Sequence, residues 1–254
     1  MTDSALIRCD VQGPLARLRL SRPEKHNAIN DRLLLTLEQQ LDDLPDSVRV
    51  IVLSGEGENF CAGLDLSEHQ AREPFAVVRH SQMWHRVLGK LHRSGLPVVA
   101  ALKGAVIGGG LELAACAHVR VADESTYFQL PEGRHGIFVG GGASVRVANI
   151  ISSNRMADMM LTGRRLSAAE GEQYGLVHYR VEAEALETRA TELAETISQN
   201  SALSNWAMVT ALSRIESMSM DDGLFTESLV AGMTQTSPEV QARIGQFLNR
   251  KQSS

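Results

Sequence analysis

The first twenty residues alternate apolar and polar side chains in two short runs. Residues 6–11 and 15–20 form these runs, and Gly13-Pro14 separates them. Alternation with a period of two is typical of strands that bury one face, and Gly and Pro mark a turn between them. The pattern therefore predicts an antiparallel hairpin at the start of the chain.

Beyond the hairpin, short apolar runs alternate with stretches of helical periodicity. Asn30 or Asp31 is a suitable cap for a helix whose leucines recur on one face. Apolar runs that end at glycine or polar residues predict buried strands, and these are residues 48–53, 98–102, 119–122, 126–128 and 177–181. Further helices are expected toward residues 84–91, from Ala143, from Arg155 and, through a capping box, after Ser167. This alternation predicts an α/β domain.

From Ala183 onward the strand signals stop. Helical patterns over 183–199, 201–217, 220–232 and 238–251 fill the remainder. A helical segment this short buries little by itself, so it is expected to pack on the α/β part or on another subunit. We therefore expect an α/β part at residues 1–195 and a helical region at 196–254. Helix 183–199 is compatible with either side.

Composition and charge narrow the function classes. The 254 residues are 43% hydrophobic and 22% charged, which is typical of a globular protein with one large core. No apolar run reaches the roughly 18–20 residues of a membrane-spanning helix, and no signal-peptide core is seen, so we expect a cytoplasmic protein without a membrane partner. A formal net charge of −5 with scattered Lys and Arg argues against nucleic acid as the partner.

The cysteines and histidines give no sign of a disulfide framework or a metal site. The three cysteines are widely spaced. His80, His85 and His92 have no evident carboxylate or cysteine partner in the sequence pattern. We therefore predict no bound metal.

Three consecutive glycines precede one carboxylate in an otherwise apolar run. Gly108–Gly110 fall between the predicted strand 98–102 and a helix that begins near Leu111. Glycines allow a ligand to approach the backbone, and the first amides of a helix attract a negative oxygen. The spacing fits neither a dinucleotide fingerprint nor a phosphate loop. The sequence thus predicts an anion-stabilising turn of another kind.

Two glutamates occupy similar places in successive loop–helix units. Glu112 follows the first glycine run, and Glu132 follows the strand 126–128, ahead of a second glycine cluster at 140–142. An acid in the first turn of a helix is favoured by the helix dipole alone. A pair of carboxylates in different environments is also a common means of handling a proton and a water. Spacing alone leaves both interpretations open.

Six short motifs occur in order along nearly the whole chain. They are Arg22–Ala28, Phe60–Leu66, Pro97–Gly104, Gly108–Ala114, Pro131-Glu132 and Tyr174–Val177. Together they resemble the crotonase, or enoyl-CoA hydratase/isomerase, superfamily. The resemblance implies an α/β spiral of β-β-α repeats with a C-terminal helical region that mediates trimers, often paired into hexamers. It implies an acyl-CoA thioester substrate, with coenzyme A as part of the substrate and no separate cofactor.

The same resemblance implies roles for five residues in catalysis. The backbone amides of Leu64 and Gly109 would form an oxyanion hole that holds the thioester oxygen as an enolate. Glu112 would chiefly orient and activate water, and Glu132 would exchange a proton with C2. The amide of Gly140 would help to place the water. Two such amides and an acid–base pair suit water addition, because negative charge develops on the carbonyl oxygen as water adds to the C2–C3 double bond.

Five further residues match the CoA-binding segments of the family. Ala62 and Leu66 match the adenine-pocket segment, together with Leu64, and Lys25 matches a residue near the CoA phosphates. Phe247 and Lys251 resemble the C-terminal segment that reaches a CoA, commonly that of a neighbouring subunit. The resemblance thus implies that the CoA site is completed within an oligomer.

The stretch 127–142 differs from that of the housekeeping β-oxidation hydratase. It is similar to a subgroup containing methylthioacryloyl-CoA hydratase, which hydrates its substrate and then releases free CoA. We therefore expect an enoyl-CoA hydratase, with a thioester hydrolase, lyase or isomerase of the same family as the alternative. Retention of both glutamates counts against an isomerase, which usually needs one base. Phe75, Trp84 and Phe138 either shape an acyl pocket or pack in the core.

Overall fold

The computed structural model of the chain describes residues 6–68 and 73–252. The side chains of Glu68 and of residues 246–252 lie outside that description. Over the described ranges, no helix combines the length and the apolar character needed to cross a membrane.

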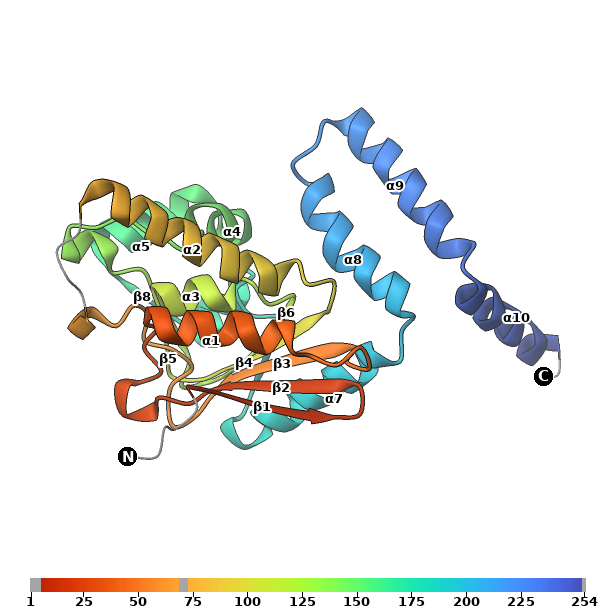
Figure 1. Cartoon of the computed structure of the whole chain (residues 1–254), viewed down its shortest axis with the longest axis horizontal. Coiled ribbons are helices and arrows are strands. Elements are labelled where there is room, and N and C mark those ends of the chain that lie inside the picture. Colours follow the sequence, from red (N-terminus) through yellow and green to blue (C-terminus); the bar gives the residue numbers. More distant parts are fainter. Residues whose placement is uncertain (1–5, 69–72, 253–254) are drawn as a thin grey trace.

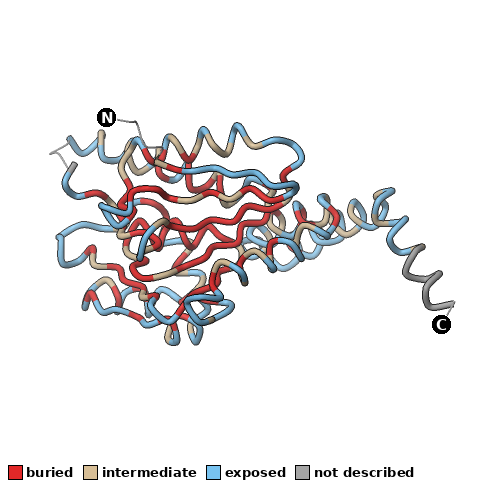
Figure 2. The backbone as a smooth tube through the Cα atoms, turned by 90° about the horizontal axis from the view of Figure 1, so that it is seen from below, coloured by how far each residue is buried: buried red, intermediate tan, exposed pale blue. Residues whose placement is uncertain are grey.

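A six-stranded sheet forms the centre of the molecule. Its strand order is β1-β2-β3-β4-β6-β9, where β1 (Ile7–Gln12) and β2 (Leu15–Leu20) form the predicted antiparallel hairpin. The other strands run parallel to β2 and to one another: β3 (Val50–Gly55), β4 (Val98–Leu102), β6 (Val119–Asp123) and β9 (Tyr179–Val181). Both β3 and β4 are buried along their whole length, as Figure 2 shows in red. Their continuous apolar runs follow from cover on both faces of a parallel sheet.

A second, three-stranded sheet lies beside the glycine turns. It consists of β5 (Ala105–Ile107), β7 (Tyr127–Gln129) and β8 (Arg165–Ser167), in that order. The sequence pattern predicted β7 and missed β5 and β8, which form by pairing with β7 from distant parts of the chain. The turn at Gly108 therefore follows β5 and not β4 as predicted. Parallel pairing of β5 with β7 brings the ends that lead to Glu112 and Glu132 side by side.

Helices cover the sheet on the side of the glycine turns. They are α1 (Asp31–Asp42), α2 (Pro74–His92), α3 (Gly109–Ala114), α4 (Ala143–Ile151), α5 (Ser153–Thr162) and α6 (Ala168–Gln173), and Figure 1 shows their arrangement. Short 3-10 helices span Pro23–Lys25, Leu66–Glu68, Glu132–His135 and Ala183–Ala185. Asn30 caps α1 by accepting a hydrogen bond from Leu33 N at 2.9 Å. The predicted capping box at Ser167 opens α6.

The C-terminal helices divide into one that joins the core and three that leave it. Helix α7 (Leu186–Ser198) packs on β3, β4 and β6, where Leu186, Ala190 and Ala194 are buried against the second face of the sheet. Helices α8 (Ala202–Ile215), α9 (Met220–Gln235) and α10 (Pro238–Gln252) project away from this body (Figure 1). Helix 183–199, which the sequence left open, thus packs with the α/β part.

Candidate active site

Glu112 lies in α3 with its carboxylate buried and bonded to backbone amides. Its residue exposure is 3%, and Oε1 accepts hydrogen bonds from Gly141 N at 2.8 Å and Ala143 N at 2.9 Å. These amides lie at the second glycine cluster and the start of α4, where backbone N–H groups have no helical partner. Burial raises the pKa of Glu112, while the two amides and the charge of Arg146 lower it. A carboxylate at Glu112 is therefore compatible with the apolar run around it, because the loop before α4 supplies hydrogen-bond donors for that carboxylate.

Glu132 begins the 3-10 helix after β7 and has a different environment. A Cβ on Gly108 would lie 2.9 Å from Glu132 Oε1, so the turn at Gly108 makes room for this side chain. Glu132 Oε2 is buried, and among the described residues it has no hydrogen-bond partner. Burial raises the pKa of Glu132 to about 7; its own backbone amide lowers it, and the nearby charge of Glu112 raises it further. Glu132 can therefore exchange a proton near neutral pH.

The amides of Leu64 and Gly109 lie next to each other. A Cβ built on Gly109 would be 3.5 Å from Leu64 N, and one on Gly63 would be 3.3 Å from Gly109 N. Gly109 is the first residue of α3, so its amide has no partner within the helix. Leu64 forms an isolated parallel β-bridge with Ile29. The hydrogen bonds of this bridge come from the residues on either side of Leu64: Ile29 N donates to Gly63 O, and Asp65 N donates to Ile29 O. Because successive N–H groups of extended backbone point to opposite sides, Leu64 N–H faces away from Ile29. Two adjacent amides of this kind suit an oxyanion hole.

A cavity of about 270 Å³ connects these groups. Leu64, Gly109, Glu112, Glu132 and Gly140 all line it, so the fold brings the five predicted catalytic residues together. The other lining residues are Asn30, Asp31, Asp65, Val77, His80, Ser81, Trp84, Ile137, Phe138, Val139 and Gly141. Of the three aromatic candidates, Trp84 and Phe138 line the cavity, while Phe75 is 67% exposed beside Arg79.

Of the predicted CoA contacts, Lys25, Ala62 and Leu66 are not among the residues that line this cavity. Lys25 Nζ donates a hydrogen bond to Ser67 Oγ at 3.2 Å, and Leu66 is 49% exposed. Ala62 is half-buried, two residues before Leu64. Phe247 and Lys251 belong to α10, and their side chains are outside the described part of the chain. Whether these residues contact CoA therefore stays a prediction.

Sequence reasoning missed several groups that shape the site. Ser81 Oγ donates to Gly140 O at 2.6 Å, and Arg146 donates through a terminal nitrogen to Gly141 O at 2.6 Å. These contacts fix the carbonyls of the loop whose amides hold Glu112. His80, for which the sequence showed no carboxylate partner, is bonded to Asp31 at 2.6 Å. Within the described ranges, no group of three or more His, Cys, Asp or Glu side chains is placed to hold a metal ion.

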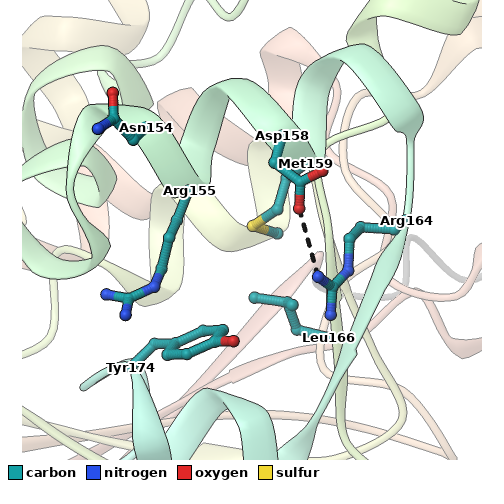
Figure 3. A pocket seen from close by; sticks show the side chains of 7 residues that line it. All are labelled: Asn154, Arg155, Asp158, Met159, Arg164, Leu166 and Tyr174. Carbon is teal, nitrogen blue, oxygen red and sulfur yellow. Dashed lines mark hydrogen bonds and ion pairs between the residues drawn. The ribbon is translucent and has the colours of Figure 1, made fainter.

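A second cavity, of about 200 Å³, lies between α5, β8 and α6 (Figure 3). Arg155 stacks over the ring of Tyr174 at 4.2 Å, and Arg164 pairs with Asp158 at 3.3 Å. Arg164 also pairs with Glu170. None of the predicted site residues lines this second cavity, and its Arg164 is already paired with two carboxylates. The first cavity is therefore the candidate active site.

Comparisons with known proteins place the chain in a family. Residues 10–254 match the family model described as enoyl-CoA hydratase/isomerase, and the chain therefore belongs to that family. The crystal structure of a protein named putative enoyl-CoA hydratase, from Rhodopseudomonas palustris CGA009, superimposes with a TM-score of 0.95 and 48% identity over 98% of this chain and 96% of that one. The predicted crotonase fold and the prediction of an enzyme of this class are thus confirmed.

Two curated relatives are named for hydratase activity. Enoyl-CoA hydratase EchA19 of Mycobacterium tuberculosis is 33% identical over 206 residues, which cover 78% of this chain and 77% of that protein. The 2,3-dehydroadipyl-CoA hydratase of Escherichia coli is 29% identical over 238 residues, or 92% of each chain. Both names give hydration as the reaction, and only the second specifies an acyl group.

Proposed function

We propose that this protein adds water across the 2,3-double bond of an enoyl-CoA thioester. The observation that carries the proposal is the set of four groups around one cavity: two adjacent amides, at Leu64 and Gly109, and two buried carboxylates, at Glu112 and Glu132. Losing one oxyanion donor typically costs roughly 10²–10³ in rate, and each acid–base group contributes roughly 10²–10⁴.

In this mechanism the two glutamates have separate tasks. Glu112, held by two amides, orients and activates the water that attacks C3. Glu132, with a pKa near 7, gives its proton to C2 as the enolate collapses. The oxygen of the thioester carries the negative charge between these steps and accepts from both amides. The Gly140 amide is proposed to place the water, since Gly140 lines the same cavity. The reaction as drawn needs no cofactor beyond the CoA of the substrate.

Substituting each glutamate separately tests the proposal. Glu112→Gln and Glu132→Gln should each lower kcat for crotonyl-CoA hydration by about 10²–10⁴. The assay follows the loss of the conjugated thioester absorbance. The glutamine at 112 can still accept from Gly141 N and Ala143 N, so its melting temperature should stay close to that of the parent protein. Full activity in either variant would contradict the two-glutamate mechanism.

The similarity of residues 127–142 to the methylthioacryloyl-CoA hydratase subgroup adds a second candidate step, thioester hydrolysis after hydration. A thiol reagent in the same assay separates the possibilities. Free CoA that appears after hydration supports the two-step reaction, while free CoA without prior hydration supports a thioester hydrolase. Isomerisation of the double bond would consume no water and release no free CoA.

We also propose a homotrimer, or a hexamer of two trimers, built through the projecting helices. Helices α8 and α9 expose many large apolar side chains: Trp206, Met208, Leu212, Met220, Leu224, Phe225, Leu229 and Met233. An apolar surface of this kind is typical of a protein–protein interface. In such an assembly Phe247 and Lys251 of α10 would meet a CoA bound to a neighbouring subunit. The cytoplasmic location stays a prediction.

A further inference from the structure

Most polar side chains that line the active-site cavity already have partners. Oε1 of Glu112 accepts from two amides, and Ser81 donates to Gly140 O. Asp65 pairs with the buried Arg22 at 3.0 Å. Ser81 and Asp65 therefore have little capacity left for a ligand, while the second oxygen of Glu112 and the unpartnered Oε2 of Glu132 are already assigned to the proposed reaction.

His80 differs from these residues because one ring nitrogen is engaged and the other is not. Its Nε2 lies 2.6 Å from Asp31 Oδ1. An ionised carboxylate only accepts hydrogen bonds, so Nε2 carries the proton that joins the two groups. Within residues 6–68 and 73–252, no partner is found for Nδ1. Asp31 thus fixes the orientation of an imidazole with one open position in a cavity that His80 lines.

The position of His80 along α2 assigns it to the acyl part of the substrate. Trp84, one turn further on, reaches the catalytic centre: its ring carbons lie 2.8 Å from a Cβ built on Gly109 and 2.9 Å from one built on Gly141. The rings of His80 and Trp84 are 6.4 Å apart between centroids. Lys25, Ala62 and Leu66, the proposed CoA contacts, do not line the cavity, so under the proposed function the cavity is left for the acyl group. His80 therefore lines the cavity one helical turn away from the residue that contacts the proposed reaction centre.

The chemistry of the surroundings selects the group that His80 would bind. A simple alkyl end would leave Nδ1 without a partner after water is displaced, which is unfavourable. A carboxylate would bring a further negative charge close to the Glu112 carboxylate, which lines the same cavity. A hydroxyl is neutral, and it can donate to Nδ1 of a neutral imidazole or accept from a protonated one.

We propose that the Asp31–His80 pair selects enoyl-CoA substrates with a hydroxyl group on the acyl chain beyond C3. This inference rests on the proposed hydratase function and specifies its substrate class. Asp31 orients the ring, and His80 Nδ1 binds the hydroxyl.

Two substrates of equal size test this specificity in the full-length protein. The probes are 5-hydroxy-2-pentenoyl-CoA and 2-hexenoyl-CoA, which differ by exchange of a hydroxyl for a methyl group. For the parent protein, kcat/KM should be at least about tenfold higher for the hydroxylated probe, since a site built to bind a hydroxyl rejects the analogue without it. His80→Leu should abolish this preference, read as the ratio of kcat/KM for the two probes measured in the same variant.

A conservative variant separates binding from structure. In His80→Asn the side-chain amide takes the place of Nδ1 and loses the contact with Asp31. It should regain part of the preference for the hydroxylated probe, whereas a merely structural role of His80 predicts equal changes for both probes. Equal kcat/KM for the two probes in the parent protein, with crotonyl-CoA still hydrated, overturns this inference alone. Failure to hydrate any 2-enoyl-CoA overturns the proposed function and this inference with it.

Discussion

At Gly141, the addition of a single methyl group should displace the Glu112 carboxylate from the position in which it is proposed to orient water. A Cβ at position 141 would lie 2.4 Å from Glu112 Oε2 and 2.9 Å from Trp84 Cε3, whereas ordinary contact begins at 3.4 Å. Glu112 must therefore retreat by about 1 Å or lose its bonds to the amides of Gly141 and Ala143. A misplacement of about 1 Å can cost roughly 10²-fold in rate, or about 2.7 kcal/mol of transition-state stabilisation.

The expected result for Gly141→Ala is a fall of about 10²-fold in kcat for crotonyl-CoA hydration. Gly232→Ala in α9 is the matched control, because among the described residues of one subunit no atom outside the local helix backbone lies within 4 Å of its Cβ position. Circular dichroism melts confirm that both variants fold. The substitution acts through Glu112, so in a Glu112→Gln background Gly141→Ala should cost less than about threefold.

Two results would refute this reasoning. Unchanged activity in Gly141→Ala would show that the Glu112 carboxylate does not need the position that the amides give it. An equal loss of activity in the Glu112→Gln background would show that the methyl group acts elsewhere, for example through Trp84. Stopped-flow measurement of the absorbance change separates chemistry from product release in both backgrounds.

Three further predictions concern pH, stability and assembly. The pKa of Glu132 is raised from 4.5 to about 7, and Glu132 must be protonated to give a proton to C2. Therefore kcat/KM for hydration should fall as pH rises through about 7. Between about pH 4.5 and 7 the folded protein keeps this proton while the unfolded chain has lost it, so the free energy of unfolding should decrease as pH rises across this range. Urea titrations at a series of pH values measure this slope, which should be flatter in Glu132→Gln. Arg22→Met leaves Asp65 buried without its ion-pair partner and should lower the free energy of unfolding by about 3–5 kcal/mol in urea titrations; adding Asp65→Asn should restore part of it, and no recovery would contradict the pairing argument. Phe225→Glu on the exposed face of α9 should shift the mass seen by light scattering toward the monomer, and an unchanged mass would remove that face from the proposed interface.

The local pattern was sufficient where an element is long enough to show its period. The hairpin β1–β2, helix α1 with its cap Asn30 and the capping box at Ser167 all follow from neighbours in sequence. Strands β5 and β8 were missed because their structure depends on pairing with β7, which is a contact between segments distant in sequence. The glycine runs and the two glutamates were visible as residue types, and the family resemblance supplied their roles.

Contacts between distant segments decided what those residue types do. Glu112 obtains its donors from Gly141 and Ala143, 29 and 31 residues away, and His80 obtains Asp31 from 49 residues away. The sequence by itself determined the class of fold, the elements with a clear period and the presence of two carboxylates near flexible amides. Only the tertiary structure decided which amides satisfy which carboxylate and which histidine faces the cavity. The physical reason is that periodicity and capping act within a few residues, whereas burial and hydrogen-bond partners depend on segments that the fold brings together.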